Sequence, residues 1–211
     1  MSDLLEAEDE EQALEQLHEL GCTDGLPVVI PTPERVNQCV LASGMDGDML
    51  LGELGPAMGN ATVEKVATAA VMAGCKSDYM PLVVAAVKAA ASPEFDLSEL
   101  QATTHCTAPL IIVNGPARDT CGPVASGYGA LGPRHRANAS IGRALRLCLI
   151  NIGGGRPGIS DMAIHGHPGK FTYCLAEAEE QSPFPPLHVS LGYDESDSVV
   201  TLLGCEAPHS V

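Results

Sequence analysis

Apolar residues recur at helical spacing in several parts of the chain. Leucines among acidic residues predict an amphipathic helix over residues 3–20, which Gly21 ends. Thr32 before Pro33 predicts the start of a second, short helix. The Ala-rich segment 61–75, with Thr62 as cap, and the segment from about 79 to 91 predict two further helices. Their short connector indicates an antiparallel helical pair.

Short apolar runs predict the strands. Residues 109–115 form a continuous apolar run typical of a central strand, and residues 100–104 predict a strand before it. The segments 171–178, 186–190 and 198–204 predict strands near the end of the chain. Residues 43–60 and 115–133 read as loops, and residues 138–151 as a long helix.

Helices and strands mix here without a strict βαβ repeat. This order predicts an α/β (or α+β) fold: a single domain with a mixed sheet, a helical pair and a long central helix. We expect the helix within residues 1–20 to be an appendage, and residues 21–211 to form one catalytic or substrate-binding domain.

The amino-acid composition excludes some classes of binding partner. The chain has 211 residues, 45% of them hydrophobic but only 3% aromatic, so the core is aliphatic and base-stacking surfaces are scarce. Its formal net charge is -16 with 11 Lys and Arg. Binding to phosphate backbones or anionic membranes depends on many cations, so we expect neither nucleic acid nor a membrane as a partner. Locally, however, residues 134–156 are basic.

Eight cysteines are spread along the chain with no CxxC pair. The acidic N-terminus lacks the apolar stretch of a signal peptide, and no apolar run reaches the roughly 20 residues that a membrane span needs. We therefore expect reduced, mostly buried thiols and a cytoplasmic protein.

The passage from Gly127 into the long helix is the first candidate site. Glycines let main-chain amides approach a ligand, and a helix N-terminus favours an anion. Arg143 and Arg146 share one helical face and predict a clamp for a carboxylate or phosphate, with Asn138 and Tyr128 as further substrate-binding residues. The alternative is that Asn138 caps the helix and the arginines pair with surface acids.

The second candidate is the segment from His165 to Lys170. His165 and His167 are one residue apart and could chelate a metal with a third ligand from elsewhere, such as His105, Cys106, His188 or Glu177. Without a metal, His167 could act as a general base with Lys170 as its electrostatic partner. Ordinary structural histidines are the alternative. No cofactor follows from the sequence, although a metal stays open.

Two other segments carry candidate catalytic residues. His105 follows a predicted strand, and ligands collect at strand ends. Its neighbour Cys106 would point to the opposite face. Glu177 leaves another predicted strand, whereas Glu179 and Glu180 read as a solvated acidic turn.

The same segments resemble a family of bacterial proteins without an established reaction. The matching motifs, including QATTH and HPGKFTYC, lie at residues 23–36, 61–87, 101–105, 130–147, 152–158, 167–189 and 199–203. The resemblance implies a companion subunit of thiol or selenol proteins with a UGSC motif. Cys106 stands where the family pattern has proline, and His165 falls outside the HPGK motif. The matching motifs contain Asn138, Arg143, His167, Lys170 and Glu177.

These observations favour an enzyme, or the substrate-holding subunit of a heteromeric enzyme, acting on a small anionic molecule by acid–base or lyase-type chemistry. His167, Lys170, His105 and Glu177 would be its catalytic residues. The alternatives are a metal-dependent enzyme using His165 and His167, and a non-catalytic structural subunit. We expect a homo-oligomer or a complex with a second protein.

Overall fold

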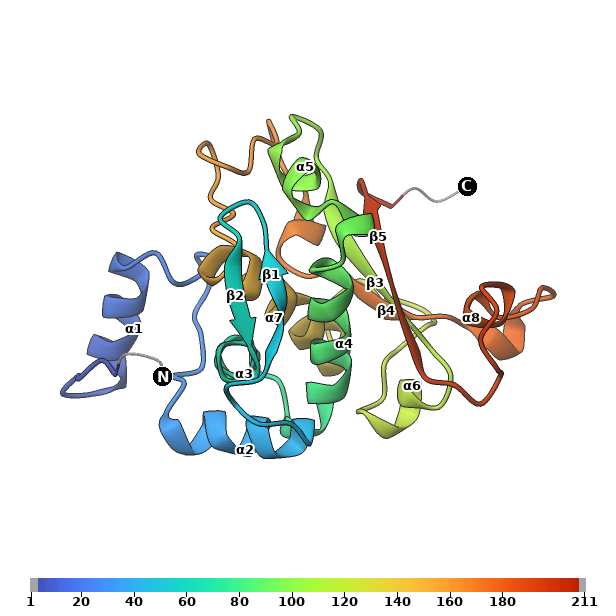
Figure 1. The fold of residues 1–211 in the computed structure, drawn as a ribbon, viewed down its shortest axis with the longest axis horizontal. Coiled ribbons are helices and arrows are strands. Elements are labelled where there is room, and N and C mark those ends of the chain that lie inside the picture. Colours follow the sequence, from blue (N-terminus) through green and yellow to red (C-terminus); the bar gives the residue numbers. More distant parts are fainter. Residues whose placement is uncertain (1–3, 209–211) are drawn as a thin grey trace.

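The computed structural model describes residues 4–208 of the chain (Figure 1). Its helices are α1 (Glu10–Glu19), α2 (Pro33–Ser43), α3 (Val63–Met72), α4 (Met80–Ala90), α5 (Leu97–Ala102), α6 (Ala117–Thr120), α7 (Arg136–Asn151) and α8 (Leu187–Ser190). Its strands are β1 (Leu50–Leu54), β2 (Gly59–Thr62), β3 (Ala108–Asn114), β4 (Cys174–Ala176) and β5 (Val199–Cys205). Short 3-10 turns are η1 (Ser77–Tyr79), η2 (Pro93–Phe95), η3 (Pro168–Lys170) and η4 (Glu179–Gln181). Asp3, where the predicted first helix begins, and the last three residues of the predicted domain lie outside the described residues.

Three strands form a mixed sheet in the order β4-β3-β5. The central strand β3 runs parallel to β4, with Ile111 opposite Cys174, and antiparallel to β5, with Leu110 opposite Leu203. The strands β1 and β2 form a separate antiparallel hairpin. The predicted fold class, a single α/β domain with a mixed sheet, is confirmed.

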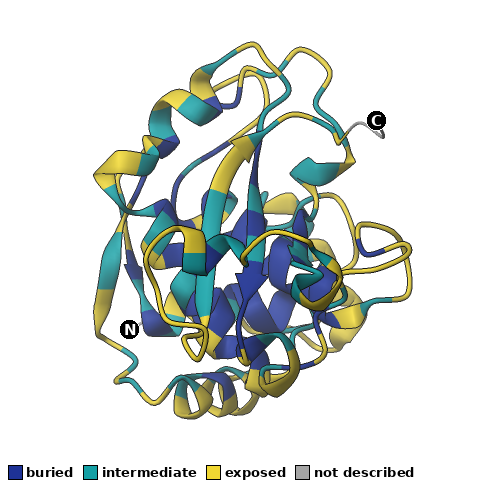
Figure 2. Cartoon of the chain, turned by 90° about the vertical axis from the view of Figure 1, so that its right-hand side faces the viewer, coloured by how far each residue is buried: buried dark blue, intermediate teal, exposed yellow. Residues whose placement is uncertain are grey.

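The aliphatic core lies between the sheet and the helices α3, α4 and α7 (Figure 1). The side chains of Ile111, Val113, Ile141 and Leu147 are fully buried there. Buried residues gather in the middle of the molecule, and exposed residues occupy the outer loops and helices (Figure 2). Because the helices α3 and α4 are rich in Ala and Val, they pack closely without large aromatic side chains.

The predicted helix signals hold. The side chains of Thr32 and Thr62 accept hydrogen bonds from the main-chain N–H groups of Arg35 and Lys65 at the starts of α2 and α3. Gly21 follows α1 with a positive φ of 66°. The long helix begins at Arg136, two residues earlier than the prediction, and the helix α1 occupies only the second half of the predicted 3–20 segment.

Three predictions of local structure are wrong. Residues 100–104 do not form a strand, because Leu97 and Gln101 are both buried at the four-residue spacing of the helix α5. Residues 187–190 form the short helix α8 after two prolines. The expected loop 43–60 contains β1 and the first two residues of β2, and the hairpin packs on the core through the fully buried Leu54 and Ala61. Cys106 consequently precedes a strand rather than following one.

No helix between residues 4 and 208 has the length and apolar character needed to span a membrane. All eight cysteines, which lie within this range, are free thiols.

Candidate functional site

A cavity of about 410 Å³ lies at the N-terminus of α7, and we call it the helix-start cavity. Three segments form its walls: residues 76–79 between α3 and α4, residues 123–125 after α6, and residues 134–137 around the start of α7. The lining residues are Lys76, Tyr79, Pro123, Val124, Ala125, Arg134, His135, Arg136 and Ala137.

The helix α7 presents an uncapped N-terminus to this cavity. Its N-cap residue, His135, makes no side-chain capping hydrogen bond, and the N–H of Ala139 is the first to bond back, to the His135 carbonyl. The three preceding N–H groups therefore have no intrahelical partner. Because α7 is 16 residues long, its aligned peptide dipoles favour an anion at this end.

Three cationic side chains surround the helix start. Arg136 is held in place by its Nε and Nη2 atoms, which donate to the Gly74 carbonyl at 3.2 and 2.9 Å. Within residues 4–208, neither Lys76, Arg134 nor Arg136 forms an ion pair with a carboxylate. Their charges are therefore not paired with a carboxylate in the described part of the chain.

Arg134 has a main-chain conformation that side-chain-bearing residues rarely adopt. Its φ is 97°, in the region that favours glycine. Such strain persists only where the surrounding structure imposes it, and it concentrates at functional sites. Here the strained residue carries one of the three cations of the helix-start cavity.

Two other side chains in the walls bear on its chemistry. Burial raises the pKa of Tyr79, and the Asp78 carboxylate acts in the same direction, so the phenol keeps its proton and can donate it in a hydrogen bond. His135 adds an imidazole, the side chain used most often in proton transfer. Gly122, with a φ of 85°, packs against the Tyr79 ring so closely that any side chain there would collide with it.

Asn138, predicted to bind substrate, instead shapes the wall of this cavity. It is 3% exposed. Its Oδ1 accepts from the Ala125 N–H at 2.8 Å, and its Nδ2 donates to the carbonyls of Ala125 and Ala130 at 2.9 and 3.2 Å. Asn138 is thus a positioning residue. Tyr128, the other predicted substrate-binding residue of this passage, is fully exposed at 105% and does not line the helix-start cavity.

The predicted clamp arginines are engaged within the chain. Arg143 holds Asp24 through two hydrogen bonds of 2.7 and 2.8 Å and also donates to the Pro27 carbonyl. Arg146 is buried, and its Nη1 lies 3.8 Å from Asp161 Oδ2. Burial lowers the pKa of Arg146. Neither arginine lines the cavity, so the cations at the helix start are Arg134 and Arg136 instead.

His167 and Lys170 do not line the helix-start cavity either. Lys170 Nζ binds both oxygens of Asp161, at 2.8 and 2.7 Å. His167 Nδ1 accepts from the Gly169 N–H at 3.1 Å, so the proton of the neutral ring lies on Nε2, which is buried without a hydrogen-bond partner in residues 4–208. Burial and the nearby Lys170 lower the pKa of His167, against the raising effect of the Cys205 main chain.

His105 lies near the same region but on its surface. Its Nδ1 is 2.9 Å from Glu206 Oε1, while the Tyr173 hydroxyl donates to the Glu206 carbonyl and the Tyr173 ring meets His167 edge-on. Neither His105 nor His167 lines the helix-start cavity.

Within the described residues, the fold brings no further metal ligands to His165 and His167. His165 is exposed. In the part of the chain that the structure describes, no three His, Cys, Asp or Glu side chains converge as a metal site would require. The third ligand that the sequence left open is therefore not provided within residues 4–208.

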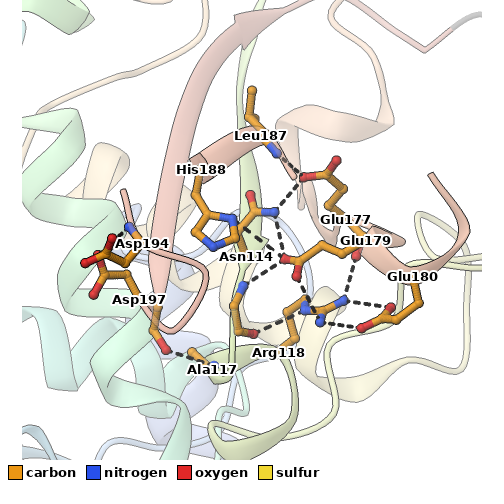
Figure 3. A network of polar contacts seen from close by, with 12 residues as sticks. Asn114, Ala117, Arg118, Glu177, Glu179, Glu180, Leu187, His188, Asp194 and Asp197 are labelled. Carbon is orange, nitrogen blue, oxygen red and sulfur yellow. Dashed lines mark hydrogen bonds and ion pairs between the residues drawn. The ribbon is translucent and has the colours of Figure 1, made fainter. Parts of the chain in front are cut away.

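Glu177 belongs to a second polar cluster, which we call the strand-end network (Figure 3). Glu177 and Glu179 accept from Asn114 Nδ2 at 2.6 and 2.9 Å, and Glu179 also accepts from the Gly115 N–H. The Arg118 guanidinium lies 3.1 Å from Glu179 and 2.7 Å from Glu180. The members of this network are Asn114, Arg118, Glu177, Glu179, Glu180 and His188.

This network lies at the carboxyl ends of the parallel strands β3 and β4, where ligands often bind in open sheets. Yet His188 is fully buried, with Nδ1 4.0 Å from Glu179 Oε1 and neither ring nitrogen hydrogen-bonded within residues 4–208. Glu177 also accepts from the Leu187 N–H at 2.8 Å. The network therefore ties α6 and α8 to the strand ends, and Glu179 is not in a solvated turn.

Comparison of the chain with protein-family models, with curated proteins and with solved structures finds no match. The candidate site consequently rests on its geometry. The helix-start cavity offers three cations, unpaired helix N–H groups and two side chains that can exchange or donate protons, and that combination suits a small anion.

The sequence predicted a site at the passage into the long helix, and the structure places a cavity there whose walls include four residues not named as site residues: Lys76, Tyr79, Arg134 and Arg136. A signal for two of them was present, because Arg134 and Arg136 flank the helix start itself, where an anion would sit. Lys76 and Tyr79 are brought to the site by the fold of the helical pair, which the sequence pattern of the long helix does not encode.

Proposed function

We propose that this chain binds a small anionic molecule, a carboxylate or a phosphate, in the helix-start cavity. The observation that carries the proposal is the convergence of Lys76, Arg134 and Arg136 on an uncapped N-terminus in a chain with a formal net charge of -16. An acidic protein repels anions at long range, so a local cationic cavity concentrates them at one place.

The bound anion would meet groups suited to acid–base chemistry. His135 is the residue that would accept or donate a proton, and the Tyr79 hydroxyl would donate a hydrogen bond to developing negative charge. This supports an enzyme, or the substrate-holding subunit of one, with lyase-type chemistry at a carbon next to the anionic group. Localisation in the cytoplasm fits the free thiols.

The first test is calorimetric titration with inorganic phosphate and with pyruvate at low ionic strength. Lys76→Met should weaken phosphate binding about tenfold, because it removes one charge-assisted contact worth roughly 1–2 kcal/mol. Lys88→Met is the matched control, since Lys88 is an exposed lysine near the far end of α4. Equal affinities in the two variants, or no binding of either anion, would contradict the proposal.

The proton-transfer step has its own readout. His135→Gln should leave phosphate affinity unchanged and slow the exchange of the pyruvate methyl protons with D₂O, followed by NMR. If the exchange rate in that variant equals that of the wild type, His135 does not transfer the proton. The chain would then hold the substrate without catalysing this step.

We also propose that the chain works as a homo-oligomer or with a second protein. Leu203 on β5 is 43% exposed beside its partner Leu110 across the ladder, and Ile164 is 71% exposed. Apolar surface of this kind is typical of protein contacts when it is contiguous. Light scattering that gives 21.9 kDa at high concentration, with no co-purifying protein, would count against this assembly.

A further inference from the structure

A second cavity of about 560 Å³ adjoins the helix-start cavity, and we call it the neighbouring cavity. Lys76 and Arg136 line both, so the two spaces meet at these side chains. The neighbouring cavity adds Arg35, Gln38, Ser77 and Asp78. Two spaces that share a cationic boundary can hold the two ends of one ligand.

Arg136 is fixed at this boundary. Its Nε and Nη2 atoms both donate to the Gly74 carbonyl, and Gly74 itself lines the neighbouring cavity. The Nη1 atom makes no hydrogen bond within residues 4–208, so it stays available to a ligand. The guanidinium charge acts on both cavities, because it belongs to the wall of each.

Each cavity also has a cation of its own. Arg134 lines only the helix-start cavity and Arg35 only the neighbouring one. Arg35 donates to the Ile30 carbonyl at 2.8 Å, and the exposed Glu10 carboxylate lies 3.9 Å from its guanidinium. A contact of this length on the surface competes little with a ligand.

The charge balance decides between a ligand with one anionic group and one with two. Four of the 11 Lys and Arg residues line these cavities, against a single carboxylate, Asp78. Four cations placed close together repel one another. One anion at the helix start would offset this repulsion at that end alone. The thiol of Cys75, in the neighbouring cavity, adds no negative charge, because burial raises its pKa to about 12.

Building on the anion site of the proposed function, we infer that its ligand carries an anionic group at each end, a bisphosphate or a phosphorylated carboxylic acid. One end lies at the start of α7 between Arg134 and Arg136. The other end reaches Arg35, and the polar side chains of Gln38 and Ser77 face the middle or far part of the molecule.

The test compares n-propylphosphonate with alkane bisphosphonates of three to six carbons by calorimetry. The best bisphosphonate should bind at least about tenfold more tightly than the one-ended probe, since its second end binds as an intramolecular event. Arg35→Gln should reduce bisphosphonate affinity to that of the one-ended probe and leave the latter unchanged. Arg35→Lys, which keeps the charge, should recover most of the difference.

Ser77→Asp gives an independent variant, because Ser77 is exposed and tolerates a carboxylate. It should weaken only the bisphosphonates. If both probes bind equally and Arg134→Gly weakens both, the two-ended ligand is wrong while the anion site stands. If neither probe binds the folded wild-type protein, the anion site itself is wrong.

Discussion

The strand-end network and the helix-start cavity both collect charged side chains, but only the network contains both signs of charge. In the network, Arg118 lies against Glu179 and Glu180, and the side chains of Arg118 and Glu179 are 15% and 12% exposed. In the cavity, Arg134 and Arg136 are exposed and have no carboxylate partner within residues 4–208. The charges of the network are paired within the fold, whereas those of the cavity are the ones that we propose to bind an anion.

Two arginines of α7 show the same contrast within one helix. The Arg143 guanidinium makes two hydrogen bonds to the carboxylate of Asp24, which lies 119 positions away in the sequence. The Arg136 guanidinium, two turns earlier, donates to the Gly74 carbonyl and forms no ion pair within residues 4–208. An arginine's role therefore depends on which carboxylate the fold brings to it, and residue type alone does not decide it.

The largest expected effect comes from a substitution in the strand-end network. Glu179→Leu leaves Arg118, the Gly115 N–H and Asn114 without a shared acceptor in a nearly buried place, so it should lower the free energy of unfolding by about 3 kcal/mol. Urea denaturation measures this. Glu195→Gln is the control, because Glu195 is an exposed loop carboxylate without a described partner. A loss below about 1 kcal/mol would mean that the network behaves like an exposed ion pair.

The sequence predicted those elements whose signal is local. The caps Thr32 and Thr62, the continuous apolar run of β3 and the helical period of α7 depend on neighbours a few residues apart. The hairpin of β1 and β2 was missed because its stability comes from burying Leu54 against distant segments. The residues of α5 were misread since a short segment carries too few periods to distinguish helix from strand.

The sequence predicted an anion site at the passage into α7, and the cavity at that passage is lined by other residues than the predicted ones. The glycine-rich passage into α7 does border a cavity, and Asn138 does belong to its wall. Whether Arg143 or Arg136 faces a ligand depends on the position of Asp24, which no local pattern reveals. Glu179 likewise looked solvated, because its partner Asn114 comes from another strand.

The second prediction tests the helix-start cavity with a matched pair of variants. Arg134→Gly and Arg134→Ala both remove the guanidinium, so both should weaken phosphate binding about tenfold. Only glycine relieves the positive φ of 97°, so Arg134→Gly should be more stable than Arg134→Ala by about 1 kcal/mol. Calorimetry and urea denaturation measure the two effects. Equal stability of the variants would show that the strain at this position is negligible.

The smallest effect concerns the exposed edge of the strand-end network. The hydrogen bond from Arg118 lowers the pKa of Glu180 to about 2 from its ordinary value of 4.5. As the pH falls below 4.5, the unfolded chain takes up a proton at this position before the folded protein does. The stability that Glu180 contributes is therefore present above pH 4.5 and is lost as the pH falls toward about 2. Because this side chain is 73% exposed, the contribution is small and weakens in salt.

Glu180→Gln removes this ionisation. The variant should be slightly less stable than the wild type at neutral pH, and the difference should disappear as the pH falls from 4.5 toward 2. Urea denaturation at a series of pH values in low salt measures the difference, with Glu195→Gln as the variant that should show none. A difference that stays constant over this range would mean that Glu180 acts by packing rather than by charge. The charged network would then end at Glu179, and the contrast with the open cavity would rest on buried pairs alone.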